Sequence, residues 1–434
     1  MDKLKVSRYL IFVNNPEGDL TVYNTLHNNL SMVKKEDYNF FIHLLDGIDD
    51  ADTNDPNYLE LLRHNIVCFD HVDEEHIAKK IYKDVINDKS QLSVIILPTE
   101  KCNFRCVYCY EDFKNGKMSL KTINNTVKFV NCELKDYQSL YVSWFGGEPL
   151  LEMNIIRRLS HEFMKECKKT KKCYIAGMTT NGYLLNVGIM KELINLHVLN
   201  YQITIDGNEK SHDETRPLAN GNGTFEVIIK NLLNIKKYIK TSTIQIMIRV
   251  NVTNTVTQVE VNELMELFKD DKRFVFNVQK ANDYSGKNKN LLKDINEYFD
   301  IFKCTKSQLN EIPKPSTTIC YAAKSNSFTI RANGDLCKCT VHFNQNNHIC
   351  NLNDSINWQY INNFSFCNCN SDERICKQCI IYPLCMGCKC PATSQIDCVK
   401  EITYISLHVK NLHKKAVPIK FMNFSIKRLV DEKK

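Results

Sequence analysis

The sequence predicts an α/β protein whose main part is a parallel sheet covered by helices. Between residues 91 and 282, strand-like runs alternate with helix-like runs, which is the pattern of strand–helix–strand units. A smaller α+β module is expected before this part, and a cysteine-rich segment after it. We therefore expect a module at 1–90, the α/β part at 91–282, a connector at 283–319, the cysteine-rich domain at 320–400 and a tail at 401–434.

The strands and helices of the main part follow from apolar runs and their spacing. The predicted strands are Val94–Leu97, Leu140–Phe145, Tyr174–Met178, Tyr201–Ile205, Ile244–Val252 and Phe274–Val278. The predicted helices between them are Leu120–Leu134, Asn154–Cys167, Val187–Leu196, Phe225–Ile239 and Gln258–Phe268. This alternation by itself indicates only an α/β class.

The first 90 residues predict two strands followed by helices. The strands are Tyr9–Val13 and Leu20–Tyr23, joined by a turn, and the helices are Lys35–Leu45 and Tyr58–His64. A short strand at Ile66–Phe69 follows. One interpretation of such a module is an N-terminal cap that packs on the main domain.

Composition and charge narrow the class of protein. Apolar residues make up 43% and charged residues 25%, as in an ordinary globular chain. The net charge of +7 comes from scattered lysines, so we expect no nucleic-acid partner, whereas a mildly basic face suits an acidic peptide. There is no signal-peptide pattern and no apolar run of about 18 residues. We expect a cytoplasmic protein without a membrane span.

The 20 cysteines are the strongest compositional signal. The cytosol is reducing, so these cysteines are expected to bind metal rather than form disulfides. Eleven of them fall between Cys337 and Cys398, in a stretch with little periodicity. Such a stretch is not expected to build a large apolar core, and we expect metal to hold it together.

Cys102, Cys106 and Cys109 follow the first strand of the main part with the spacing C-x3-C-x2-C. A loop of this kind can place three thiolates round one face of a 4Fe-4S cube and leave the fourth iron free for a small molecule. A structural zinc site or three unrelated buried cysteines are the alternatives, because thiolates also suit zinc.

With Tyr108 before its last cysteine, this loop resembles the cluster motif of radical S-adenosylmethionine (SAM) enzymes. The resemblance implies a partial (β/α)6 barrel and SAM bound to the open iron. It also implies cleavage of SAM to methionine and a 5′-deoxyadenosyl radical, which takes a hydrogen atom from the substrate. By the same resemblance, Tyr108 would lie beside the adenine.

The run Gly146-Gly147-Glu148-Pro149 follows the second strand and resembles the GGEP motif of that family. Two glycines let the backbone approach a ligand closely, and a carboxylate can hold a cation. The resemblance implies that this run binds the SAM amine, with help from Glu148. Taken alone, a Gly-Gly at a strand end is often only a tight turn.

The residues after the fourth strand resemble the family's S-x-D-G … H-D … R segment, with Thr204 where a serine is usual. The match implies that Thr204, Asp206 and Arg216 belong to the SAM site. Thr204 and Arg216 would contact the ribose and the carboxylate, and an arginine pairs well with a carboxylate. For Asp206 and His212, an Asp-Gly turn and a helix cap remain the alternative.

The C-terminal cysteines resemble the SPASM extension of radical SAM proteins, which holds two auxiliary 4Fe-4S clusters. The resemblance implies that the second cluster is held by Cys376, Cys379, Cys385 and Cys398. It implies that the first is held by Cys320, Cys339 and Cys390. Zinc ribbons are the alternative, because paired cysteines of this spacing are ordinary zinc ligands.

Two departures from the SPASM pattern leave the first auxiliary site open. Lys389 stands where a cysteine is usual, so Cys388 or Cys390 must serve, and the following proline favours Cys390. Cys337 could replace Cys339. Lys314 stands where a further ligand is usual, so this cluster either has an open iron or borrows another cysteine.

These resemblances predict a radical SAM peptide maturase that forms thioether crosslinks in a ribosomally made precursor peptide. The first 90 residues resemble a winged-helix-like domain that binds a leader peptide as an added strand. A flavodoxin or ferredoxin is the expected reductant. Formylglycine formation, C–C linkage and epimerisation are the alternative reactions, and no catalytic base can be placed. An electron carrier or a zinc-bound peptide-binding protein is the non-enzymatic alternative.

Overall fold

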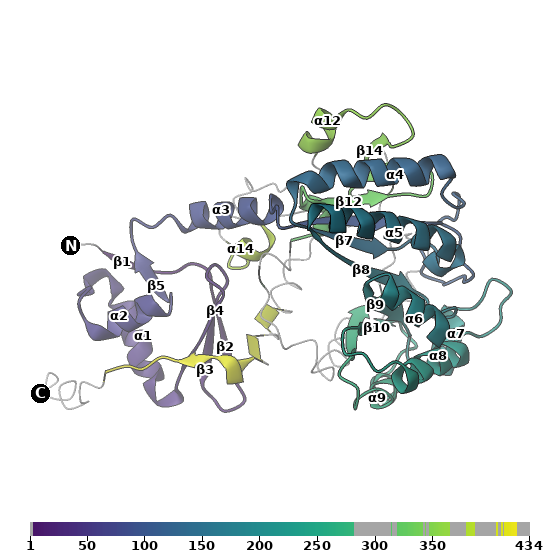
Figure 1. The fold of residues 1–434 in the computed structure, drawn as a ribbon. Coiled ribbons are helices and arrows are strands. Elements are labelled where there is room, and N and C mark those ends of the chain that lie inside the picture. Colours follow the sequence, from purple (N-terminus) through teal and green to yellow (C-terminus); the bar gives the residue numbers. More distant parts are fainter. Residues whose placement is uncertain are drawn as a thin grey trace, which may run out of the picture.

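The computed structural model contains a small N-terminal module and a large sheet, linked in sequence by a helix (Figure 1). It describes residues 3–281, 314, 319–341, 343, 347–364, 379–386, 405–406, 409–410 and 412–422. No helix within these ranges is long and apolar enough to cross a membrane.

The N-terminal module contains more strands than the sequence predicted. Its elements are β1 Leu4–Val6, β2 Leu10–Asn14, β3 Leu20–Asn24, β4 Asn29–Val33, η1 Lys35–Asp37, α1 Tyr38–Asp46, η2 Ile48–Asp50, α2 Pro56–Arg63, β5 Val67–Phe69 and α3 Glu74–Ile86. Strands β2, β3 and β4 form an antiparallel meander, and β1 pairs with β5.

Strand β4 was missed because both faces of the meander are covered. One face, with Val22 and Val33, packs on Phe41 of α1. The other face, with Tyr23 and Leu30, packs on C-terminal residues such as Leu384. A strand that is buried on both faces lacks the polar–apolar alternation that marks a half-exposed strand.

The main sheet confirms the predicted α/β alternation. Its elements are β6 Gln91–Ile96, α4 Leu120–Glu133, η3 Leu134–Asp136, β7 Ser139–Trp144, η4 Pro149–Glu152, α5 Met153–Thr170, β8 Cys173–Thr180, α6 Val187–Asn195, β9 Val198–Thr204, α7 Glu209–Thr215, α8 Phe225–Tyr238, β10 Gln245–Val252, α9 Gln258–Glu266 and β11 Phe274–Lys280. Alternate strand residues are fully buried in the same core as the helices, for example Val94 and Val142 with Phe163 of α5. The period of two therefore sets which strand face the helices cover.

The strand order explains why this sheet is an open, partial barrel. Strands β6 to β11 are parallel and adjacent in sequence order, as expected when every connection runs in the same direction. Strand β6 pairs with β12 instead of β11, so the sheet does not close on itself among the described strands. The carboxyl ends of β6, β7, β8 and β9 therefore meet at one edge.

The described part of the cysteine-rich segment packs on the main sheet. Its described elements are η7 Tyr321–Ala323, β12 Ser327–Ile330, β13 Asp335–Cys337, β14 His348–Asn351, α12 Trp358–Asn363, α14 Tyr382–Cys385, η8 His413–Lys415 and β15 Val417–Pro418. Strands β12 to β14 extend the main sheet, and Phe328, Ile330 and Leu336 join its core. The apolar residues of these short strands are too few to show a period, but they pack on a core built by other elements.

Candidate functional site

The three predicted cluster cysteines lie in the loop between β6 and α4. Thr99 and Lys117 form a β-bridge at its base. Its middle runs beside the residues that follow α7, where Arg105 N donates to Pro217 O at 2.9 Å and Val107 N donates to Thr215 O at 2.9 Å. These backbone bonds fix the loop against a segment that is about a hundred residues away in sequence.

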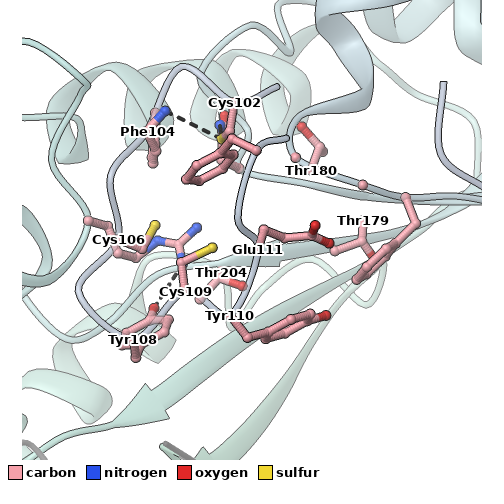
Figure 2. Close-up of a pocket in the computed structure, with 16 residues that line it drawn as sticks. Cys102, Phe104, Cys106, Tyr108, Cys109, Tyr110, Glu111, Thr179, Thr180 and Thr204 are labelled. Atoms are coloured by element: carbon pink, nitrogen blue, oxygen red, sulfur yellow. Dashed lines mark hydrogen bonds between the residues drawn. The ribbon is translucent and has the colours of Figure 1, made fainter. Parts of the chain in front are cut away.

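The loop closes over a cavity of about 160 Å³ at the carboxyl ends of β6 to β9 (Figure 2). Among its lining residues are these predicted site residues: Cys102, Cys106, Tyr108, Cys109, Gly146, Gly147, Thr204 and Arg216. Glu148, Pro149 and Asp206 do not line the cavity and lie behind its wall, buried. The structure thus brings together thiols, a guanidinium group and backbone that the sequence scatters over more than a hundred residues.

The two glycines let the end of β7 lie directly against the cysteine loop. A Cβ on Gly146 would lie 2.3 Å from Thr99 O, and one on Gly147 would lie 2.3 Å from Lys101 O. Gly146 also has a φ of +113°, which L-residues rarely adopt. Only glycine therefore allows this close approach, which forms one wall of the cavity.

Glu148 is fully buried and saturated with hydrogen bonds. Its carboxylate accepts from Thr180 Oγ1 at 2.7 Å, Asn181 N at 2.8 Å and Leu150 N at 3.0 Å. Burial raises the pKa of Glu148, and these hydrogen bonds oppose the shift. Asn181 in turn donates through Nδ2 to Asn103 Oδ1 at 2.8 Å, beside Cys102. In the described structure Glu148 positions the Thr180–Asn181 turn and the loop that contacts it.

Tyr108 is held by a buried polar network. Its hydroxyl accepts from Arg216 Nη1 at 2.8 Å and Asn251 Nδ2 at 3.1 Å, and it donates to the carboxylate of Asp206. Asp206 also accepts from Asn251 N at 2.9 Å. Burial raises the pKa of Asp206, and the nearby Arg216 guanidinium opposes the shift. Asp206 therefore orients the tyrosine, and it reaches the cavity only through that residue.

His212 has a structural place in this network. Its Nδ1 accepts from Asp206 N at 3.1 Å, and its Nε2 lies 3.1 Å from Thr224 Oγ1. Burial lowers the pKa of His212 far below its usual value, so the ring is neutral. It does not line the cavity, and its two ring nitrogens contact the Asp206 backbone and the Thr224 hydroxyl instead.

Arg216 and the thiols give the cavity the chemistry that a cluster with SAM requires. Arg216 Nε is buried without a hydrogen-bond partner in the described structure, so it can donate to a carboxylate. Burial raises the pKa of Cys102 to about 12 and that of Cys109 to about 11, and it also raises the pKa of Cys106. The thiols therefore need a bound cationic centre to lose their protons, as metal ligands do.

Glu111 is a cavity residue that the sequence analysis missed. It lines the cavity two residues after Cys109, and its buried Oε1 has no hydrogen-bond partner in the described part of the chain. Burial, and then the nearby Glu100 carboxylate, raise the pKa of Glu111 to about 7. The only signal in the sequence was a glutamate next to the loop aromatic Tyr110. A single charged residue in a loop is normally exposed, so this signal does not indicate a buried carboxylate oxygen.

The described auxiliary cysteines fall into two groups. Cys339 is buried in a small cluster with Ala322, which follows Cys320 by two residues. Cys379 and Cys385 pack against the N-terminal module. The first group is fastened to the cysteine loop, because Arg331 forms a bidentate ion pair with Glu100 at 3.1 and 2.7 Å. The predicted ligands outside the described residues are Cys376, Cys390 and Cys398.

Comparisons with known proteins show what this chain is similar to. Residues 96–268 match the Radical SAM superfamily. The chain is 29% identical over 194 residues to a cysteine-type anaerobic sulfatase-maturating enzyme of Clostridium novyi, covering 42% of this chain and 50% of that protein. It is 22% identical over 271 residues to the radical SAM cyclopropyl synthase TigE of Paramaledivibacter caminithermalis, covering 54% and 55%. The chain spans about half the length of the curated relatives it matches.

A solved structure shares the fold over most of the chain. The structure of anSMEcpe with bound AdoMet and Cp18Cys peptide matches with a TM-score of 0.59, at 20% identity, over 75% of this chain and 99% of that one. Residues 96–268, which contain the cysteine loop, therefore form a radical SAM domain. That part of the chain is also the part that is similar to a sulfatase-maturating enzyme in sequence and to anSMEcpe in fold.

Proposed function

We propose that this protein uses SAM to modify a ribosomally made precursor peptide by radical chemistry. One observation carries the proposal: three loop thiols, the Arg216 guanidinium and the Gly146–Gly147 backbone surround one cavity at the carboxyl edge of the sheet. A parallel α/β sheet binds its ligands at this edge. The names of the relatives, a sulfatase-maturating enzyme and a peptide-bound neighbour, support a peptide substrate.

Each residue of the cavity has a role in this proposal. Cys102, Cys106 and Cys109 would hold three irons of a 4Fe-4S cluster. When bound, that cluster supplies the electron that cleaves SAM into methionine and a 5′-deoxyadenosyl radical. Arg216 donates to the SAM carboxylate, and Tyr108 packs beside the adenine. Gly146 and Gly147 offer backbone to the amine, while Glu148 and Asp206 hold the walls in place.

The proposed product is a thioether crosslink. A C–H bond of one peptide residue and the S–H bond of a cysteine are broken, and a C–S bond is formed. One hydrogen atom ends on 5′-deoxyadenosine, and one proton and one electron are left over. The electron needs an acceptor, and Cys320 and Cys339 are the described residues that would hold one. A flavodoxin or ferredoxin is proposed as the source of the first electron.

Formylglycine formation is the second candidate, and Glu111 favours it. That reaction oxidises a cysteine Cβ, so a base must take up a proton near the radical. The Glu111 carboxylate lines the cavity, and among the described residues its Oε1 has no hydrogen-bond partner. Its product has lost two hydrogens and exchanged sulfur for oxygen, which distinguishes it from a thioether.

Mass spectrometry of a cysteine-containing precursor peptide that is co-expressed with the enzyme tests the proposal. A loss of two hydrogens per link, with the cysteine no longer alkylated by iodoacetamide, supports the thioether. Replacement of sulfur by oxygen supports formylglycine. The same experiment with the Cys102/Cys106/Cys109→Ala variant must give unmodified peptide. An unchanged peptide with the unsubstituted enzyme sinks both reactions for that peptide.

A further inference from the structure

The outer edge of the N-terminal meander is covered by the chain's own C-terminal residues. Residues 417–422, called the tail segment below, follow η8 and lie along β4; Figure 1 shows β15 (yellow) beside the N-terminal module. Val417 pairs with Ser31 and Pro418 with Met32, in parallel. Ile419 N then donates to Met32 O at 2.9 Å. The tail segment is therefore a fourth strand of this sheet, contributed from almost 400 residues away.

The tail segment is anchored by alternate side chains. Ile419 is 3% exposed and joins the core formed by α1, α2 and the meander. Two residues later, the Phe421 ring meets Phe40 edge to face, with centroids 5.5 Å apart. Val417 and Met422 are 58% and 61% exposed. The groove between β4 and the two helices thus receives one apolar side chain at each of two alternate positions.

Helix α2 binds the backbone of the tail segment as well. Met422 N donates to Asn57 Oδ1 at 2.9 Å, and Lys420 N donates to Glu60 Oε1 at 3.4 Å. Asn57 and Glu60 both belong to α2. Backbone contacts on both sides of the groove are independent of sequence, so only the two apolar positions select the occupant.

The pairing between the tail segment and β4 is short, so another strand can replace the tail segment. Only two residue pairs form, and Pro418 has no N–H to give to β4. The tail segment nevertheless occupies the edge because it is tethered, which gives it an effective concentration in the millimolar range. A second peptide that pairs over more residues would displace it.

We propose that the tail segment is an intramolecular competitor of the precursor peptide. It occupies the groove between β4, α1 and α2, which contains the edge where the resemblance to a leader-binding domain implies strand addition, and the peptide must displace it. The proposal rests on the proposed function, because the peptide that would bind in this groove is the precursor peptide. The peptide is recognised by two large apolar side chains at positions i and i+2. The tail segment covers the apolar groove until the peptide arrives.

A peptide copied from the tail segment tests the proposal without knowledge of the precursor. A fluorescein-labelled synthetic peptide with the sequence of residues 414–424 is titrated into full-length protein, and anisotropy is read. The Ile419→Asp/Phe421→Ala variant should bind this peptide at least about tenfold more tightly than the unsubstituted protein, because its tethered competitor is weakened. Val417→Ala, which alters an exposed side chain, should bind like the unsubstituted protein. Equal affinity in all three proteins would overturn the proposal.

A second experiment measures hydrogen exchange on the unsubstituted protein, so its result does not depend on whether the variant folds. Saturating peptide should deprotect the amides of Ile419 and Met422 while those of β4 stay protected. Unchanged protection of the tail segment would also overturn the proposal. Formation of 5′-deoxyadenosine is measured in parallel. If the peptide displaces the tail segment but SAM is not cleaved, the proposed function alone is contradicted. If SAM is cleaved but the tail segment is not displaced, only its role as a competitor is contradicted.

Discussion

The two cysteine regions of this protein are built in different ways. The loop with Cys102, Cys106 and Cys109 comes from eight consecutive residues, and backbone bonds clamp it to the segment at 215–219. The described C-terminal cysteines are separated in sequence and pack in two places, Cys339 near the loop and Cys385 on the N-terminal module. A local motif can bring its own ligands together, whereas the distributed ligands depend on the packing of the rest of the chain.

Removing the loop cysteines gives the largest expected effect. The Cys102/Cys106/Cys109→Ala variant should lose the cluster that binds SAM and form no 5′-deoxyadenosine, because three ligands of one centre are removed together. Reconstituted protein with dithionite and SAM is assayed by chromatography. The Cys173→Ala variant removes an exposed thiol at the start of β8 and should keep full activity. Product from the triple variant would show that the loop does not hold the reactive cluster.

Breaking the link between the two regions should cost stability. Glu100→Gln leaves Arg331 without its buried bidentate partner, and we expect a loss of about 3 kcal/mol in the free energy of unfolding. Urea unfolding followed by circular dichroism measures it. The Glu100→Leu/Arg331→Met variant removes both charges and should recover most of the loss. A loss below about 0.5 kcal/mol, the range of exposed pairs, would mean that this link does not fasten the regions.

Changing Arg216 tests the proposed SAM contacts in the cavity beside the cysteine loop. Arg216→Lys keeps the charge but removes Nε and the fixed geometry of the guanidinium, so the KM for SAM should rise about tenfold. Iron content should remain unchanged, since no cluster ligand is altered. Arg158→Lys, on the exposed side of α5, is the matched control. An unchanged KM for SAM would remove Arg216 from the proposed SAM contacts.

The smallest expected effect is a pH dependence at Glu111. Its pKa is raised by burial, to about 7, so the folded state binds a proton more tightly than the unfolded state. The associated stability is present below the unfolded pKa and is lost as the pH rises through about 7. Glu111→Gln should therefore stabilise the cluster-free protein at pH 8 by at least about 1 kcal/mol and have almost no effect at pH 4.

Urea unfolding at these two pH values measures the difference. Glu162→Gln, at an exposed position of α5, is the matched control. If Glu111→Gln has the same effect at both pH values, the Glu111 carboxylate is not desolvated in the folded protein.

The sequence by itself determined the sheet and the cysteine loop. Each main strand, such as Val94–Leu97 or Leu140–Phe145, carries its own apolar signal, and Cys102, Cys106 and Cys109 carry theirs in their spacing. These signals are local, because a strand period and a ligand loop are properties of neighbouring residues.

Only the tertiary structure decided what surrounds them. The Tyr108–Asp206–Arg216 network and the tail segment on β4 each join residues that are distant in sequence. Glu111 has a buried Oε1 although it follows a loop motif. No local pattern records that Ile419 will fill a groove beside Met32. Burial and edge pairing arise from the packing of whole elements, and that packing fixes which polar groups are left to bind a ligand.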